Sequence, residues 1–126
     1  MRSQPLGRGV FILLLLVWTW KLLEPNPVPV ALEQELPADW RYWISKAVHF
    51  GIYLLLCLLG LWGLGQRWRW AVPAFLVLHA GLTELAQTWV PNRHGSLRDV
   101  LIDSGGIAVG VLVSRWWSRR PPLNAP

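Results

Sequence analysis

Apolar residues in this chain gather in four long blocks, separated by short segments that hold most of the charges and prolines. Within each block the apolar residues surround the helix axis, and such a helix belongs in a large core or in a membrane. A chain of 126 residues is too short to bury several such helices in a soluble core. We therefore predict an all-α membrane protein with four transmembrane helices in an antiparallel bundle. The predicted helices cover about residues 10–23, 43–65, 70–90 and 97–117.

Composition supports this prediction. Hydrophobic residues make up 53% of the chain and charged residues 15%, whereas about a quarter of the residues in a soluble protein are charged. The net charge of +5 would suit a nucleic-acid partner, but the basic residues lie between the apolar blocks and form no patch. We therefore expect no nucleic-acid partner. Cys57 is the single cysteine, which excludes an intrachain disulfide and a cysteine-based metal site.

The first block, residues 10–23, is as short as the hydrophobic region of a signal peptide. No small-x-small cleavage site follows it directly, so we prefer an uncleaved first helix to a cleaved signal. We place residues 1–9 in the cytoplasm, a membrane domain at 10–120, and a tail at 121–126 that we expect to be disordered. Residues 24–42 contain four prolines and four acidic residues and are predicted to form a solvated loop, in which 31–36 could make a short surface turn of helix.

Basic residues predict the orientation of the four helices. With the N-terminus in the cytoplasm, seven arginines lie inside and five basic residues outside, as the positive-inside rule favours. Both termini are then cytoplasmic. Every tryptophan also falls near an end of a predicted helix, which is typical of the aromatic belts at membrane interfaces.

Ionisable residues inside the predicted spans are the unusual feature, because a charge near the bilayer core costs roughly 2.5–3.5 kcal/mol. Glu84 lies six residues from the outer end of the third helix, and Asp103 lies six residues from the outer start of the fourth. Both are therefore about 9 Å below the outer boundary. Gln87 and Asp99 each lie one helical turn above them, on the same faces.

Two further groups of polar residues reach the same level. One is on the outer turns of the second helix, and the other is the loop between the third and fourth helices, where Arg93, His94 and Arg98 would cover the cluster. We predict a polar pocket open to the outer leaflet, because ionisable residues inside a membrane usually mark a functional site. The predicted functional cluster comprises Lys46, His49, Tyr53, Glu84, Gln87, Arg93, Asp99 and Asp103.

A purely structural role is one alternative. In that case Glu84 and Asp103 would only pair with basic neighbours, such as Lys46 or Arg93, and lock the bundle. The number of polar groups at one depth exceeds what packing needs, so we favour a function. His79 lies in mid-helix among apolar residues, and we expect it to be a hydrogen-bonded packing residue.

Catalysis or metal binding is another alternative. His49 and Glu84 could form an acid/base pair. Imidazole and carboxylates also bind divalent cations, so His49, Glu84, Asp99 and Asp103 are chemically able to hold one. However, the chain contains no HExxH sequence or phosphate-binding loop, and the spacing matches no metal motif. We therefore predict no metal and no cofactor, and we favour a non-enzymatic role while leaving an enzyme open.

Two stretches resemble the VanZ-like family of small bacterial membrane proteins. The first is Lys46-x-x-His49-Phe50-x-x-Tyr53, and the second is Glu84-x-x-Gln87-x-x-x-Pro91-x-Arg93. At the family's spacing there follow Ser96, Asp99, Gly106 and Gly110, the last two forming a small-xxx-small face for helix packing. The resemblance covers about residues 46–113. One departure is Asp103, where the family commonly has asparagine; an aspartate raises the demand for a cationic partner unless it is protonated.

The resemblance implies a four-helix protein of the bacterial cell membrane and, through the founding member of the family, a link to glycopeptide resistance of the teicoplanin type. We predict that the protein binds a lipid headgroup, a cell-wall precursor or a lipophilic glycopeptide at the outer leaflet, with membrane lipids as its partners. Arg93 and Lys46 would hold a phosphate or carboxylate. The alternatives are a membrane enzyme acting on a lipid-linked substrate through His49 and Glu84, and a structural bundle with intramembrane ion pairs.

Overall fold

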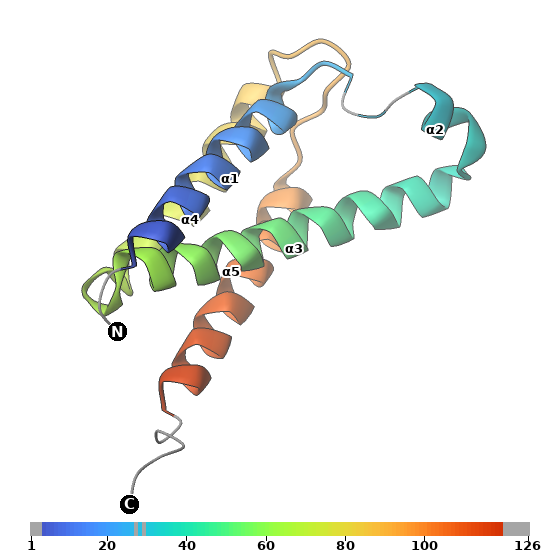
Figure 1. Ribbon diagram of the computed structural model, residues 1–126. Coiled ribbons are helices and arrows are strands. Elements are labelled where there is room, and N and C mark those ends of the chain that lie inside the picture. The colour runs from blue at the N-terminus through green and yellow to red at the C-terminus, as the bar shows by residue number, and fades with distance from the viewer. Residues whose placement is uncertain (1–3, 27, 29, 120–126) are drawn as a thin grey trace, which may run out of the picture.

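The computed structural model describes residues 4–26, 28 and 30–119 (Figure 1). Every regular element in this part of the chain is helical, which confirms the all-α prediction. The tail at 121–126, expected to be disordered, lies outside the described residues. The helices are α1 (Pro5–Leu23), α2 (Val30–Glu35), α3 (Ala38–Leu64), α4 (Ala71–Gln87) and α5 (Leu97–Ser118), with a 3-10 turn, η1 (Gln66–Trp68), after α3.

Prolines and one glycine account for most helix boundaries. Pro5 occupies the first turn of α1, where its missing N–H would have no partner in any case. Pro37 precedes α3, so this helix starts at Ala38, five residues before the predicted 43–65 helix. Gly65 ends α3 with φ of 85°, a left-handed conformation that favours glycine. α4 ends at Gln87 in hydrogen-bonded turns, three residues before the predicted end.

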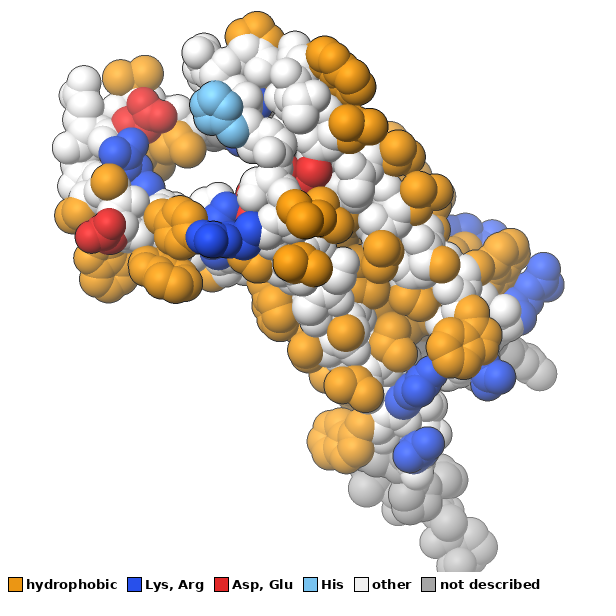
Figure 2. All heavy atoms as spheres, turned by 180° about the vertical axis from the view of Figure 1, so that it is seen from behind, with side chains coloured by type: hydrophobic (Ala, Val, Ile, Leu, Met, Phe, Trp, Pro, Cys, Tyr) orange, Lys and Arg blue, Asp and Glu red, His pale blue; other side chains and the backbone are white. Residues whose placement is uncertain are grey.

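The apolar helices and the exposed apolar surface indicate a membrane environment. α1 and α3 are long and apolar enough to cross a bilayer, while α4 is apolar but has only 17 residues. Leu13, Leu78 and Leu101 are each at least 60% exposed, and hydrophobic side chains cover much of the face drawn in Figure 2. Exposed apolar surface on this scale is costly in water. The four spans, the antiparallel bundle and the cytoplasmic termini stay predictions.

α3 is the central helix and packs against α1, α4 and α5, crossing α1 and α5 obliquely in Figure 1. The core lies at these crossings; its side chains include Phe11, Tyr53, Leu56, Leu76 and Ile107. Small residues bring the helices close together. A Cβ on Gly106 would stand 2.3 Å from the Phe50 carbonyl oxygen of α3, and one on Gly110 would stand 2.8 Å from the Cβ of Cys57.

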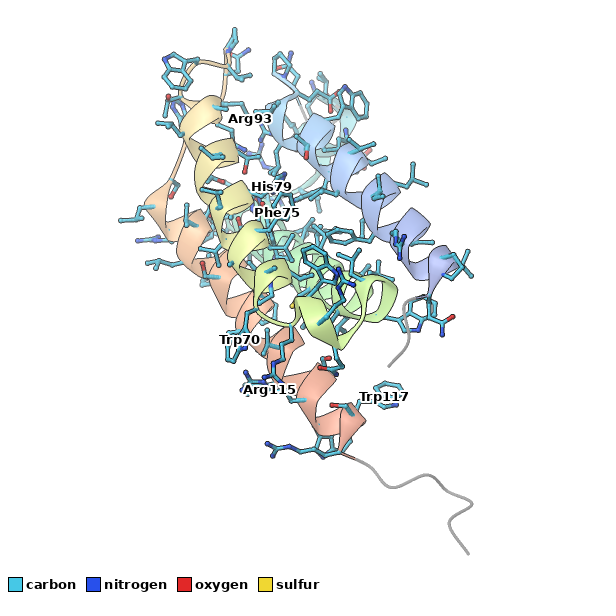
Figure 3. The ribbon with its side chains drawn as sticks, turned by 90° about the vertical axis from the view of Figure 1, so that its left-hand side faces the viewer. Trp70, Phe75, His79, Arg93, Arg115 and Trp117 are labelled. Atoms are coloured by element: carbon cyan, nitrogen blue, oxygen red, sulfur yellow. The ribbon has the colours of Figure 1, made fainter. Side chains whose placement is uncertain are left out.

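Contacts between helix ends define two ends of the molecule. The backbone N–H of Gln4 donates to the Gly63 carbonyl at 3.1 Å, which joins the start of α1 to the end of α3. We call this the inner end, following the predicted orientation. At the opposite, outer end lie the end of α1, the start of α3, the end of α4 and the start of α5. Figure 3 shows Arg93 toward the outer end, with Trp70, Arg115 and Trp117 toward the inner end.

Candidate functional site

Three ionisable side chains from three different helices meet inside the outer half of the molecule. They are His49 on α3, Glu84 on α4 and Asp103 on α5, and they are 8%, 4% and 0% exposed. One nitrogen or oxygen atom of each lies within 4.8 Å of the others. The Nδ1 of His49 is 3.1 Å from Oδ1 of Asp103, a hydrogen bond in which the ring N–H donates to the carboxylate. We call these residues the central cluster.

Among the described residues, the loop after α4 supplies the one hydrogen bond that the Glu84 side chain makes. The backbone N–H of Ser96 donates to Glu84 Oε2 at 2.7 Å. Gly95 makes this approach possible, because a Cβ there would stand 2.1 Å from the Glu84 carbonyl oxygen. Glu84 Oε1 and Asp103 Oδ2 are buried and have no hydrogen-bond partner within the described part of the chain. The central cluster therefore keeps two free carboxylate oxygens.

An ion pair covers the central cluster on its outer side. Lys46 on α3 donates from Nζ to Oδ1 of Asp99, one turn above Asp103 on α5. The Lys46 ammonium also lies 5.1 Å from the centre of the Tyr42 ring. The Tyr42 hydroxyl in turn accepts a hydrogen bond from Arg98 Nη1 at 2.8 Å. Lys46 and Asp99 thus satisfy each other, and α3 is joined to α5 at two levels.

Gln87 and Arg93 bind the end of α1. Gln87 Nε2 donates to the Leu22 carbonyl at 3.0 Å, and Arg93 donates to the carbonyls of Glu24 and Lys21 at 3.0 and 2.7 Å. The last carbonyls of a helix lack partners within the helix and carry partial negative charge, which suits a guanidinium. Burial lowers the pKa of Arg93, while the carboxylates of Glu84 and Glu24 act in the opposite direction.

A separate hydrogen-bond chain lies on the inner side of the central cluster. The Thr19 hydroxyl donates to the Leu15 carbonyl at 2.7 Å, so its oxygen is free to accept from His79 Nε2 at 2.8 Å. His79 Nδ1 then accepts from the Tyr53 hydroxyl at 2.9 Å. This arrangement agrees with the packing role expected of His79. It also places the hydroxyl of Tyr53, a predicted site residue, in a hydrogen bond with α4.

A cavity of about 360 Å³ opens beside the central cluster, between α1, α2 and α3. We call it the outer cavity. His49 lines it together with three basic side chains, and Arg41 Nε is buried there without a hydrogen-bond partner among the described residues. The remaining wall is mostly apolar. The lining residues are Trp18, Lys21, Leu22, Val28, Leu32, Leu36, Arg41, Ile44, Ser45, Val48, His49 and Arg93.

The structure brings together only part of the predicted cluster. His49, Glu84 and Asp103 form one group, Lys46 and Asp99 pair above it, and His94 is exposed. Sequence reasoning did not assign Lys21 and Arg41 to the site, although both belong to the basic residues it placed outside. It also missed the Ser96 amide, since a backbone donor has no signature in the side-chain pattern. Glu84 has no ion pair with a basic residue within 4 Å in the described ranges.

Long apolar helices, exposed apolar flanks and a buried polar cluster define a helical membrane protein with an internal polar site. A family model described as VanZ/LLP1 matches residues 9–118. The chain belongs to this family, and the predicted VanZ-like membership is confirmed. Neither a search of curated proteins nor a search of solved structures found a match.

Proposed function

We propose that this protein binds an anionic headgroup of a membrane lipid or of a lipid-linked cell-wall precursor in the outer cavity. The observation that carries the proposal is the pairing of basic and apolar walls in one cavity of about 360 Å³. Guanidinium groups bind phosphate and carboxylate through fixed N–H donors. Apolar walls suit the acyl or isoprenoid chain attached to such a headgroup.

Arg41 is the residue best placed to bind the anion. Its Nε is buried without a partner among the described residues, so a ligand oxygen would supply the missing acceptor. Arg93 and Lys21 also line the cavity, but Arg93 already donates to the end of α1, and Lys21 pairs with Glu24 at 2.6 Å. Lys46, which the sequence analysis assigned to anion binding, is engaged by Asp99.

Native mass spectrometry of the detergent-purified protein tests the proposal. We expect a phosphate-bearing lipid to copurify with the wild type and to be lost or reduced at least tenfold in Arg41→Gln. Arg67→Gln is the matched control, because Arg67 lies in η1 at the inner end and contacts the ring of Trp68. It should keep the wild-type lipid profile. Identical profiles in all three proteins would refute binding in the outer cavity.

Family membership adds a cellular measurement with the same variants. If the outer cavity binds the wall precursor or a lipophilic glycopeptide, expression of the wild type in a sensitive bacterium should raise the inhibitory concentration of teicoplanin. Arg67→Gln should do the same and Arg41→Gln should not. Equal protection by the wild type, Arg67→Gln and Arg41→Gln would show that any resistance does not depend on the outer cavity.

An enzyme acting on a lipid-linked substrate is the second candidate. It is favoured by the closeness of His49 and Glu84 in the central cluster, beside a cavity that could admit a headgroup. Incubation of the protein with its copurifying lipid distinguishes the two functions. A product formed by the wild type and absent with His49→Gln would favour an enzyme, and a lipid recovered unchanged would favour binding.

A further inference from the structure

The central cluster contains more negative charge than its neighbours balance. Glu84 and Asp103 are both carboxylates, and both are almost fully buried. The nearby cations are already engaged, because Lys46 pairs with Asp99 and Arg93 donates to two carbonyls of α1. Two carboxylates in one dry site require a proton, a cation or both.

Two buried oxygens identify where a cation would bind. Glu84 Oε1 and Asp103 Oδ2 have no hydrogen-bond partner within the described residues, although each belongs to a side chain that is more than nine-tenths buried. A buried acceptor without a donor is costly to maintain. Both oxygens belong to side chains of the cluster that also contains His49. The cluster therefore combines an imidazole nitrogen with two free carboxylate oxygens.

We propose that His49, Glu84 and Asp103 bind one divalent transition-metal ion, with Zn²⁺ as the best match. An imidazole nitrogen with two carboxylates suits zinc, whereas Mg²⁺ and Ca²⁺ prefer sites made only of oxygen. Neighbouring ligands of a tetrahedral zinc ion lie roughly 3.4 Å apart, given bonds of about 2.0–2.1 Å. His49 Nδ1 and Asp103 Oδ1 are 3.1 Å apart, so the imidazole and the carboxylate that would share the ion already lie side by side. One nitrogen or oxygen atom of each of the three side chains lies within 4.8 Å of the others, so the ligands would draw closer together around the ion.

The surroundings of the cluster support the same assignment. The Ser96 N–H holds Glu84 Oε2, which leaves Oε1 free to bind and fixes the carboxylate plane. Supporting hydrogen bonds of this kind orient metal ligands and raise affinity. Three protein ligands leave a fourth position open. Since His49 also lines the outer cavity, a ligand oxygen could occupy that position, although this last step rests on the proposed function and metal binding itself does not.

The test uses the full chain in detergent, stripped with chelator and titrated with Co²⁺ and with Zn²⁺. Tetrahedral Co²⁺ has intense visible absorption, which reports the ligand geometry directly. We expect one ion per chain in the wild type and in the control His94→Ala, whose imidazole is exposed. Asp103→Asn and His49→Gln should each lower the affinity for the metal at least about 100-fold. Removal of a residue that only supports a ligand costs up to about 100-fold, and loss of a ligand itself should cost at least as much.

Asp103→Asn keeps the test decisive if another variant does not fold, because asparagine is the residue that the family commonly has at this position. Failure of the wild type to bind either ion would overturn the proposal, and so would equal affinity in the wild type and Asp103→Asn. Because the readout is the metal alone, this result is independent of lipid binding. Loss of lipid in Arg41→Gln with intact metal binding would separate the two sites.

Discussion

Single residues decide which polar groups of the site remain available. Glu84 keeps one oxygen free because the other accepts from the Ser96 amide, and Asp103 keeps one free because the other binds His49. Arg93, which looks like an anion-binding residue in the sequence, instead binds the end of α1. Glu84 and Arg93 do not form an ion pair in the structure. A double variant that exchanges their charges would therefore not restore stability lost in the single variants.

At this scale we predict that Gly95→Ala lowers stability. The new Cβ would meet the Glu84 carbonyl oxygen at 2.1 Å, so the loop must move and the Ser96 N–H leaves Glu84. We expect a loss of about 1–3 kcal/mol, the range for overpacking, seen as a lower melting temperature in detergent. Gly81→Ala on α4 is the control.

Nothing lies within 4 Å of a Cβ at Gly81, and alanine favours a helix over glycine by up to about 1 kcal/mol. This control should therefore melt at the wild-type temperature or higher. Equal melting temperatures for Gly95→Ala and the wild type would show that the loop reaches Glu84 without a steric requirement for glycine.

At the scale of the elements, the crossing of α3 and α5 holds the site together. His49 and Lys46 come from α3, and their partners Asp103 and Asp99 come from α5. Each pair is thus possible only because the two helices approach closely. Gly106 allows that approach, since its missing side chain leaves room for the backbone of α3 at Phe50.

We predict that Gly106→Ala separates α5 from α3 and that Gly105→Ala does not. A Cβ at Gly106 would stand 2.3 Å from the Phe50 carbonyl oxygen, a rigid backbone atom, whereas one at Gly105 would stand at an ordinary 3.5 Å from the Phe50 ring. Overpacking of this kind costs about 1–3 kcal/mol. Hydrogen exchange of the α5 amides measures the effect. Similar exchange rates in the two variants would contradict a steric role for Gly106.

At the scale of the whole molecule, cations lie over aromatic rings at both ends, whereas the ion pairs of the described residues lie in the outer half. At the outer end Lys21 pairs with Glu24 and Lys46 with Asp99. At the inner end arginines lie over tryptophan rings, with Arg115 at 5.0 Å and Arg69 at 5.8 Å from the ring of Trp70. Tryptophan and arginine together are typical of a membrane interface. Because aromatic belts lie at both interfaces, these contacts do not choose the orientation, which stays a prediction from the positive-inside rule.

Cysteine labelling tests that orientation. In a Cys57→Ala background, Gln34→Cys on α2 should react with a membrane-impermeant maleimide on intact cells. Arg67→Cys in η1 should react only after the cells are opened, because the positive-inside rule places it in the cytoplasm. The reverse pattern would show that the outer cavity lies in the inner leaflet. A lipid headgroup of the outer leaflet could then not be its ligand.

The sequence by itself determined the helical class, the apolar blocks and the family, because each depends on local periodicity or on the spacing of residues along one chain. It also placed Glu84, Asp103 and His49 at a common depth, since rise per residue is constant within a helix. Only the tertiary structure decided which polar atoms meet. Arg93 donates hydrogen bonds to the end of α1, and the backbone N–H of Ser96 donates to Glu84. Arg41 lines the same cavity as His49. These contacts depend on helix rotation and on loop path, which the order of residues along each helix does not specify.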